Sequence, residues 1–194
     1  MPALPVLWTL GYSEKNMTAS GFSMTEMMPA GSFSPEQITA LFIDAARIGD
    51  TDMLTQFLDA GMAVDAQDSR GYTALIVAAY NGVLPATALL LERGADPNRQ
   101  DAKGATALSG VAFKGHLAVA ELLVSAGAKL DIPSHLGRTP LMFAVMFGRQ
   151  DMVSLLLSHG ADPDQRDAEG LSVRDIAETH GQKHLFTSDM ASSS

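Results

Sequence analysis

The chain has 194 residues, of which 46% are hydrophobic and 18% are charged, a composition typical of one soluble globular domain. Its net charge is −9 and its Lys and Arg residues form no run, which argues against a nucleic-acid partner and against an anionic membrane surface. A neutral or basic protein partner fits this charge more easily. The absence of cysteine excludes disulfides, thiolate nucleophiles and zinc–thiolate sites.

The first predicted element is a segment without regular structure, at residues 1–33. It is rich in Met, Ser and Gly and has no hydrophobic periodicity, so we expect it to be disordered, and Met17, Met24 or Met27 could be the true start. Residues 3–10 are apolar, but no basic residue precedes them and they are far shorter than the ~20 residues of a membrane helix. We therefore expect a cytoplasmic protein.

From residue 34 onward the chain repeats itself at a constant interval. Three series of glycines share this interval: Gly71, Gly104, Gly137 and Gly170; Gly61, Gly94, Gly127 and Gly160; and Gly49, Gly82, Gly115, Gly148 and Gly181. A fixed period of this size predicts a stack of similar units. We expect a domain at residues 34–186 made of five units, at about 34–67, 68–100, 101–133, 134–166 and 167–186, followed by a frayed tail at 187–194.

Each unit is predicted to be a turn followed by two helices. The first unit opens with a capping box, Ser34 with Gln37 as its partner in the first turn. In the third unit we expect helices at 107–114 and 117–126 with Thr106 as N-cap, and in the fourth at 141–147 and 150–159 with Thr139 as N-cap.

The last unit differs from the inner ones, as a capping unit should. Arg174 stands where the inner units have Leu75, Leu108 and Leu141, which we assign to the core. A terminal unit exposes a face that inner units bury, so a polar residue is expected there.

The residues that could carry chemistry are few. Among the five histidines only His180 and His184 are one helical turn apart, and Gly181 lies between them, which argues against shared metal coordination. None of the sequence motifs for phosphate loops, dinucleotide binding, nucleophile elbows or zinc hydrolases occurs. We therefore expect no catalytic residue, no metal and no cofactor.

The repeated segments resemble the ankyrin repeat family. The residues that carry the resemblance are Gly71-Tyr72-Thr73-Ala74-Leu75, Gly104-Ala105-Thr106-Ala107-Leu108, Gly137-Arg138-Thr139-Pro140-Leu141, Gly94-Ala95-Asp96-Pro97-Asn98 and Gly160-Ala161-Asp162-Pro163-Asp164. One departure is consistent, because the family's His after the Leu is Ile76, Ser109 and Met142 here. The resemblance, closest to stand-alone bacterial-type members, implies an all-α solenoid of five helix-turn-helix units joined by β-turn fingers.

The resemblance also implies where a partner would bind, at the finger tips and along the concave groove behind them. Tyr80, Phe113 and Met146 follow the same interval as the glycines, so stacking should align them as one apolar stripe edged by basic finger tips. The alternative is that these side chains pack against a neighbouring helix or against the N-terminal segment. The candidate partner-binding residues are Arg70, Tyr72, Tyr80, Asn81, Lys103, Phe113, Lys114, Leu136, Arg138, Met146 and Phe147.

The expected function is therefore a non-catalytic protein–protein interaction module, monomeric, with one unidentified protein partner. Two narrower roles stay open at this point. The chain could be an accessory or regulatory protein for one enzyme, for example in peroxide defence, as some similar bacterial proteins are, or it could be a toxin-neutralising binder.

Overall fold

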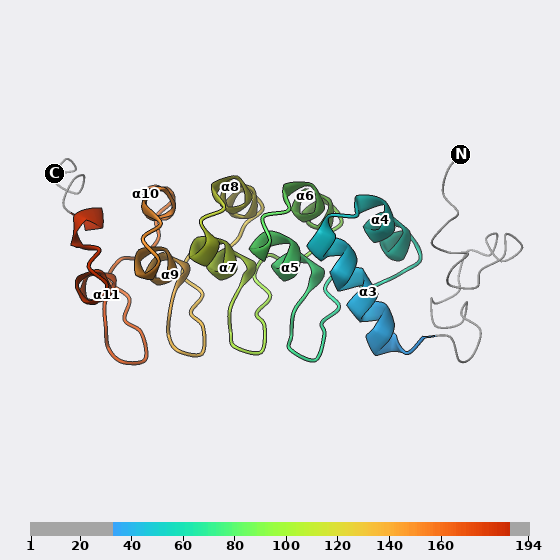
Figure 1. The fold of residues 1–194 in the computed structure, drawn as a ribbon, viewed down its shortest axis with the longest axis horizontal. Coiled ribbons are helices and arrows are strands. Elements are labelled where there is room, and N and C mark those ends of the chain that lie inside the picture. The colour runs from blue at the N-terminus through green and yellow to red at the C-terminus, as the bar shows by residue number, and fades with distance from the viewer. Residues whose placement is uncertain (1–32, 187–194) are drawn as a thin grey trace, which may run out of the picture.

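The computed structural model of the protein describes residues 33–186. The predictions of a disordered segment before residue 33 and of a frayed tail at 187–194 concern residues outside this range. Within it the helices form two parallel rows, with the fingers hanging below them (Figure 1). The row nearer the fingers comprises α3 (Pro35–Ile48), α5 (Ala74–Tyr80), α7 (Ala107–Lys114), α9 (Pro140–Met146) and α11 (Val173–Thr179). The other row comprises α4 (Thr51–Asp59), α6 (Leu84–Glu92), α8 (Leu117–Ser125), α10 (Gln150–Ser158) and the 3-10 helix η2 (Lys183–Phe186).

This arrangement confirms the predicted all-α solenoid. Consecutive helices of the finger-side row pack against one another, α3 on α5, α5 on α7, α7 on α9 and α9 on α11. Residues 33–186 contain no β-strand, only one isolated bridge between Arg166 and Ser172. None of the helices in this range is long and apolar enough to cross a bilayer.

The finger-side helices begin within one residue of the predicted positions, because a hydroxyl caps each one. Thr106 Oγ1 accepts a hydrogen bond from the N–H of Ser109 at 3.2 Å, and Thr139 Oγ1 accepts one from Met142 at 3.3 Å. Ser34 and Gln37 form the predicted capping box. The fourth unit's first helix starts at Pro140 and ends at Met146, one residue earlier at each end than predicted.

The core lies between the two helical rows and runs the length of the stack. Leu75, Leu108 and Leu141 are buried, as predicted, each in the same place on successive helices. Arg174, at the corresponding place on α11, is exposed, because no further unit covers that face.

The fingers are tied to one another through their backbones. The N–H of Ala102 donates to the carbonyl of Arg70, and the N–H of His135 donates to the carbonyl of Lys103, both at 2.9 Å. Gly104 has φ +76°, and a Cβ at this residue would lie 2.7 Å from the backbone nitrogen of His135. Glycine is therefore needed here both for the left-handed backbone and for the close approach of the next finger.

A second link joins the loops that follow the outer helices. Asp65 accepts hydrogen bonds from the N–H of Asp96 at 3.2 and 3.3 Å, and Asn98 accepts one from the N–H of Lys129 at 2.8 Å. Burial raises the pKa of Asp65, and this effect outweighs the hydrogen bond from Asp96 and the attraction of Arg99.

Candidate functional site

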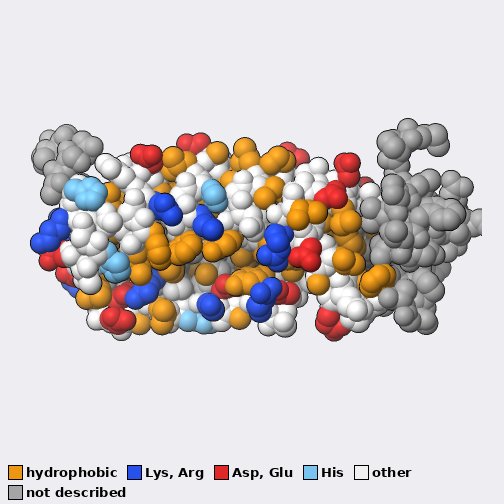
Figure 2. Space-filling model, in the orientation of Figure 1, with side chains coloured by type: hydrophobic (Ala, Val, Ile, Leu, Met, Phe, Trp, Pro, Cys, Tyr) orange, Lys and Arg blue, Asp and Glu red, His pale blue; other side chains and the backbone are white. Residues whose placement is uncertain are grey.

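The concave face carries a row of three aromatic rings that crosses three units. The rings of Tyr80 and Phe113 stack with centroids 6.1 Å apart, and the rings of Phe113 and Phe147 meet edge to face at 4.3 Å. Tyr80 is 40% exposed and Phe147 is 45% exposed, while Phe113 between them is half-buried. Figure 2 shows hydrophobic side chains in a band along this face, with Lys and Arg on both sides of it. An apolar row of this kind remains open to solvent although the core is already filled.

The structure differs from the predicted stripe at its third member. Met146 is half-buried and packs against the core, whereas Phe147 supplies the ring that contacts Phe113. Adjacent residues of a helix point about 100° apart, so only one of these two side chains can lie in the row. Phe147 is the C-cap of α9, and there its ring reaches across to α7.

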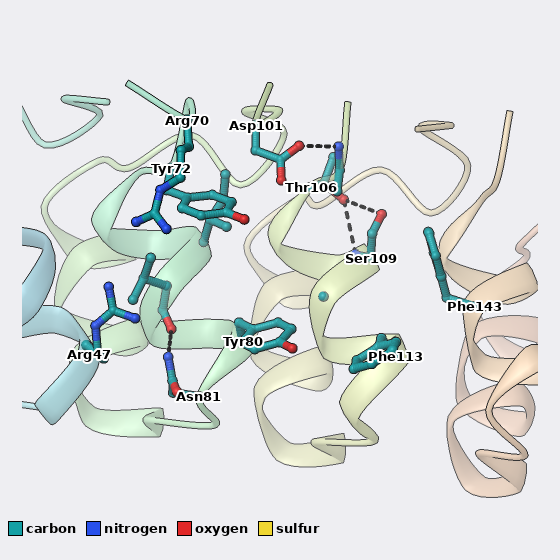
Figure 3. Close-up of a pocket in the computed structure, with 14 residues that line it drawn as sticks. Arg47, Arg70, Tyr72, Tyr80, Asn81, Asp101, Thr106, Ser109, Phe113 and Phe143 are labelled. Atoms are coloured by element: carbon teal, nitrogen blue, oxygen red, sulfur yellow. Dashed lines mark hydrogen bonds between the residues drawn. The ribbon is translucent and has the colours of Figure 1, made fainter. Parts of the chain in front are cut away.

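A hollow of about 400 Å³ lies beside this row, between the fingers and the helices α5, α7 and α9 (Figure 3). Five of the predicted partner-binding residues line it, namely Arg70, Tyr72, Tyr80, Asn81 and Phe113. Tyr72 comes from the finger of its unit, while Tyr80 and Phe113 come from the ends of α5 and α7. The repeat interval therefore places residues of the second and third units around one hollow.

Most of the remaining lining was not among the predicted site residues. It comprises Arg47, Ile76, Val77, Asp101, Ala105, Thr106, Ser109, Gly110 and Phe143. One sequence pattern could have revealed part of it, because Val77, Gly110 and Phe143 also follow the repeat interval. The glycine in the middle of this series stands where the neighbouring units carry larger apolar side chains.

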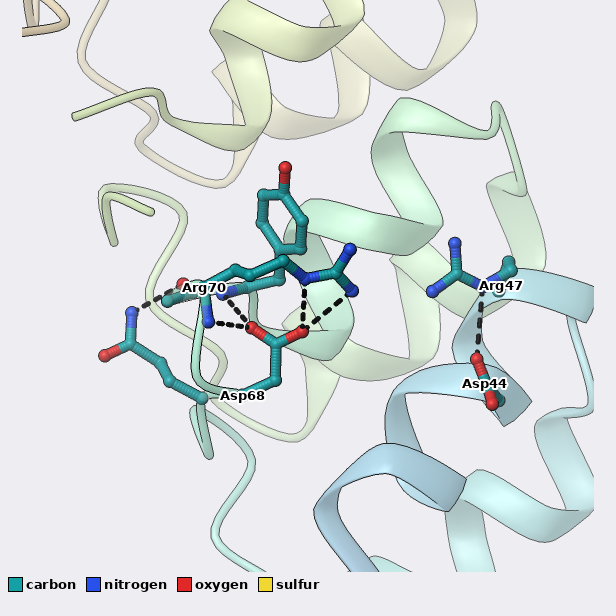
Figure 4. Close-up of polar contacts among 7 residues, drawn as sticks. Asp44, Arg47, Asp68 and Arg70 are labelled. Carbon is teal, nitrogen blue, oxygen red and sulfur yellow. Dashed lines mark hydrogen bonds and ion pairs between the residues drawn. The ribbon is translucent and has the colours of Figure 1, made fainter. Parts of the chain in front are cut away.

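Cations border the hollow, and two of them are held in place by carboxylates (Figure 4). Asp68 Oδ2 accepts from Arg70 Nη2 at 3.0 Å, and the Arg70 guanidinium lies 4.8 Å from the centroid of the Tyr72 ring. Arg47 Nε donates to Asp44 Oδ1 at 3.1 Å. These pairs leave the guanidinium groups at the rim of the hollow with fixed orientations.

The pKa of Asp68 reflects its two tasks in the finger. Burial alone would raise this pKa, but the N–H groups of Tyr72 and Arg70 and the Arg70 guanidinium together lower it below the ordinary Asp value. Asp68 is therefore a carboxylate at neutral pH, and it both shapes the turn and holds Arg70 over Tyr72.

Lys114 lies beside Tyr80, one of the residues that line the hollow. Its Nζ lies 4.9 Å from the centroid of the Tyr80 ring, within the range of a cation–π contact. Within residues 33–186 no carboxylate lies within ion-pair distance of Lys114 or of Lys103. These two ammonium groups are therefore open to an external anion.

The other predicted residues lie on fingers away from the hollow. Leu136 is 60% exposed at a finger tip, and Lys103 is exposed on the neighbouring finger. Arg138 is half-buried against the last finger, where its Nε lies 3.6 Å from Asp167 Oδ2 and its Nη2 lies 3.8 Å from Glu169 Oε1. Arg138 thus links two fingers of the same chain.

The histidines take no part in a metal cluster in the part of the chain that the structure describes. No group of three or more His, Cys, Asp or Glu side chains in residues 33–186 is placed to hold a metal ion. His180 is the C-cap of α11, and its Nδ1 lies 2.9 Å from the carbonyl oxygen of Ile176.

Comparison with known proteins identifies the repeat. A family model described as ankyrin repeats (3 copies) matches residues 21–101 and 89–167. A search of curated protein sequences found no match to the chain.

Proposed function

The chain belongs to the ankyrin repeat family, and on that premise we propose that it binds a partner protein through its concave face. Members of this family are generally protein–protein interaction modules. The proposed surface consists of the aromatic row, the hollow beside it and the cations at its rim, and we call it the concave site. The single observation that carries the proposal is the half-exposed row of Tyr80, Phe113 and Phe147.

The energetics of this row support binding rather than a role in folding. An aromatic side chain covers about 200 Å², so hiding the exposed two-fifths of Tyr80 from water contributes roughly 2 kcal/mol at about 25 cal/mol per Å². Phe147 offers a similar gain. Two such rings beside a hollow resemble the hot spots that dominate protein interfaces, where aromatic and Arg side chains cluster.

The charges at the concave site refine what the net charge of the chain suggests. The whole chain is acidic, which favours a neutral or basic partner. At the concave site, however, Arg47 and Arg70 are balanced by Asp44 and Asp68, whereas Lys114 lies over the Tyr80 ring with no carboxylate within ion-pair distance in residues 33–186. The local charge, which acts within about a Debye length, favours a neutral or acidic segment of the partner.

We propose further that the module is not catalytic. The carboxylates nearest the hollow already have structural tasks, since Asp101 Oδ1 accepts from the N–H groups of Lys103 and Ala105. General acid–base catalysis needs ionisable groups that face a substrate, and here they face the backbone of the fingers.

The test is a comparison of partner capture from the native cell by three forms of the chain. The first is the wild type, the second carries Phe113→Ser with Phe147→Ser, and the third carries Leu84→Ser as a matched control. Leu84 is 41% exposed, similar to Phe147, but it lies at the start of α6 in the other helical row.

We expect the wild type and the Leu84 variant to retain the same proteins and the double variant to lose them. Circular dichroism must show that all three forms are folded, because serine at position 113 also removes ring contacts. Equal capture by the folded double variant would reject the concave site as the binding surface.

A further inference from the structure

A glycine lines the hollow of the concave site at a position where the neighbouring units carry larger side chains. Val77 on α5, Gly110 on α7 and Phe143 on α9 occupy equivalent places in three units, and all three line the hollow. A Cβ on Gly110 would lie 3.2 Å from Tyr80 Cδ2, so the Tyr80 ring takes part of the space that a side chain there would fill, and the hollow lies beside this contact. Its volume, about 400 Å³, falls within the range of about 300–1,000 Å³ that is usual for ligand pockets.

The fold itself does not require glycine at position 110. Every other glycine in residues 33–186 has positive φ, whereas Gly110 lies inside α7 without it. A Cβ at this position would meet only the Tyr80 side chain, with Cδ2 at 3.2 Å, and no backbone atom within 4 Å. Glycine inside a helix costs about 1 kcal/mol relative to alanine, and at position 110 it gives the Tyr80 ring room to pack directly against α7.

The chemistry of the lining is apolar at the base and cationic at the rim. Val77, Phe143 and the aromatic side chains form the walls, while Arg47 and Arg70 stand at one side. Lys114 lies over the outer face of Tyr80. The one carboxylate of the lining, Asp101, is already bonded to two backbone N–H groups of its own finger.

From these observations we infer the class of ligand that the hollow takes: one large apolar side chain of a partner protein, with acidic residues on either side of it in the partner's sequence. The apolar side chain fills the space beside Gly110 and stacks against Tyr80. The flanking carboxylates pair with Lys114 and with the guanidinium groups at the rim. This inference rests on the proposed function and names the chemistry of the partner at the concave site.

A nucleic acid is the competing class of ligand, since bases also stack on aromatic rings beside cations. Two features favour the protein segment. The lining holds two cations, Arg47 and Arg70, on a chain of net charge −9, and each is already paired with a carboxylate of the same chain, which leaves little free positive charge for a phosphate backbone. The lining of the hollow also includes the apolar side chains of Ile76, Val77 and Phe143, which suit one apolar side chain better than a series of bases.

The first part of the test selects ligands without assuming a partner. Short random peptides displayed on phage are selected against the full chain at about 0.15 M salt. We expect the enriched peptides to share one Trp, Phe, Leu or Met with Asp or Glu nearby. Enrichment of peptides with basic flanks, of peptides without a large apolar residue, or of none at all would overturn the inference.

The second part locates the binding of the enriched peptides. Gly110→Val places in the third unit the residue that the second unit has at the same position, and Gly110→Ala adds only a Cβ. Both substitutions favour the helix but bring new carbon atoms against the Tyr80 ring, so we expect a nearly unchanged thermal midpoint for the Ala variant, and circular dichroism must show that the Val variant is folded. Peptide binding, measured by fluorescence polarisation, should weaken about 30-fold in the Val variant and by less in the Ala variant.

Charge is tested with Lys114→Gln. This variant should bind peptides with acidic flanks about tenfold more weakly than the wild type does. Its affinity for the same peptides with Gln and Asn in place of Glu and Asp should be unchanged. Equal effects on both peptide forms would refute the acidic part of the inference.

The outcomes separate this inference from the proposed function. Suppose that the peptides bind the Gly110→Val variant as tightly as the wild type but do not bind the variant with Phe113→Ser and Phe147→Ser. That result would refute the role of the hollow and would support the concave site as the binding surface. If neither variant changes the affinity for the peptides, the result refutes both the inference about the hollow and the proposed binding surface. Displacement of the peptides by an oligothymidylate strand that binds more tightly than they do would assign the hollow to single-stranded nucleic acid instead.

Discussion

Replacement of Gly104 by alanine tests how the fingers are held together. The substitution has two costs in the structure. Alanine in the left-handed region, at φ +76°, costs roughly 1–2 kcal/mol. The added Cβ would also lie 2.7 Å from the backbone nitrogen of His135, so the next finger must move away and strain or break its 2.9 Å hydrogen bond to Lys103. That hydrogen bond adds about 1 kcal/mol or more to the loss.

Two other glycines isolate the second cost. Gly94 has φ +85° inside the stack, and Gly170 has φ +80° at the same finger position of the last unit, yet a Cβ at either would meet nothing within 4 Å. Alanine at these two positions therefore carries only the backbone strain. The entropy that alanine removes from the unfolded chain is similar at all three positions and cancels in the comparison.

The measurement is the free energy of unfolding from urea titrations followed by circular dichroism. We expect losses of about 1–2 kcal/mol for Gly94→Ala and Gly170→Ala and about 2–4 kcal/mol for Gly104→Ala. If Gly104→Ala costs no more than its two controls, the contact between fingers contributes nothing and the reasoning about their spacing fails.

Three further predictions concern stability. Leu108→Ala should lower the free energy of unfolding by about 2–5 kcal/mol, measured in urea, because Leu108 is 0% exposed and the neighbouring units cannot fill its space. Asp65→Asn gives this loop the residue that the next unit has at Asn98, and since the raised pKa of Asp65 means that its charge is unfavourable when folded, we expect a stability gain of about 0.5–1 kcal/mol at pH 7. That gain should shrink as the pH falls and Asp65 takes up a proton, and a gain that is independent of pH from 7 to 3 would contradict it. The charge of Asp68 has the opposite effect on stability, because the pKa of Asp68 is lowered in the folded state. Its charge therefore stabilises the fold at pH values above the ordinary Asp pKa of 3.8, and this contribution is lost as the pH falls below that value. The stability difference between wild type and Asp68→Asn should therefore be present at pH 7 and vanish in acid, and thermal melts across this range measure it.

Much of the fold could be predicted from the sequence because its causes are local. Thr106 and Thr139 cap the helices that follow them, and each does so through its own hydroxyl and an N–H in the first turn of its helix. The glycines of the three series occupy positive φ, which few other residues adopt. Each unit stacks on its neighbours in the same way, so the same turn and helix pair recurs along the chain. The constant interval between units was therefore enough to predict the solenoid.

The concave site could be predicted only in part, because its details depend on how side chains of different units meet. The period aligned Tyr80 and Phe113 correctly, but it could not show that Phe147 rather than Met146 continues the row. That choice depends on where α9 ends and on which side chain the core has room for. Arg138 similarly pairs with carboxylates of the next finger, which a pattern of charges does not reveal.

By itself the sequence determined the repeat, its turns and its caps, since each follows from the preferences of a few neighbouring residues. Only the tertiary structure decided that the Tyr80 ring packs against Gly110 beside a hollow and that Lys114 and Arg70 stand over aromatic rings. The physical reason is that a cavity belongs to the space between units, where the size of a missing side chain matters only once its neighbours are packed around it.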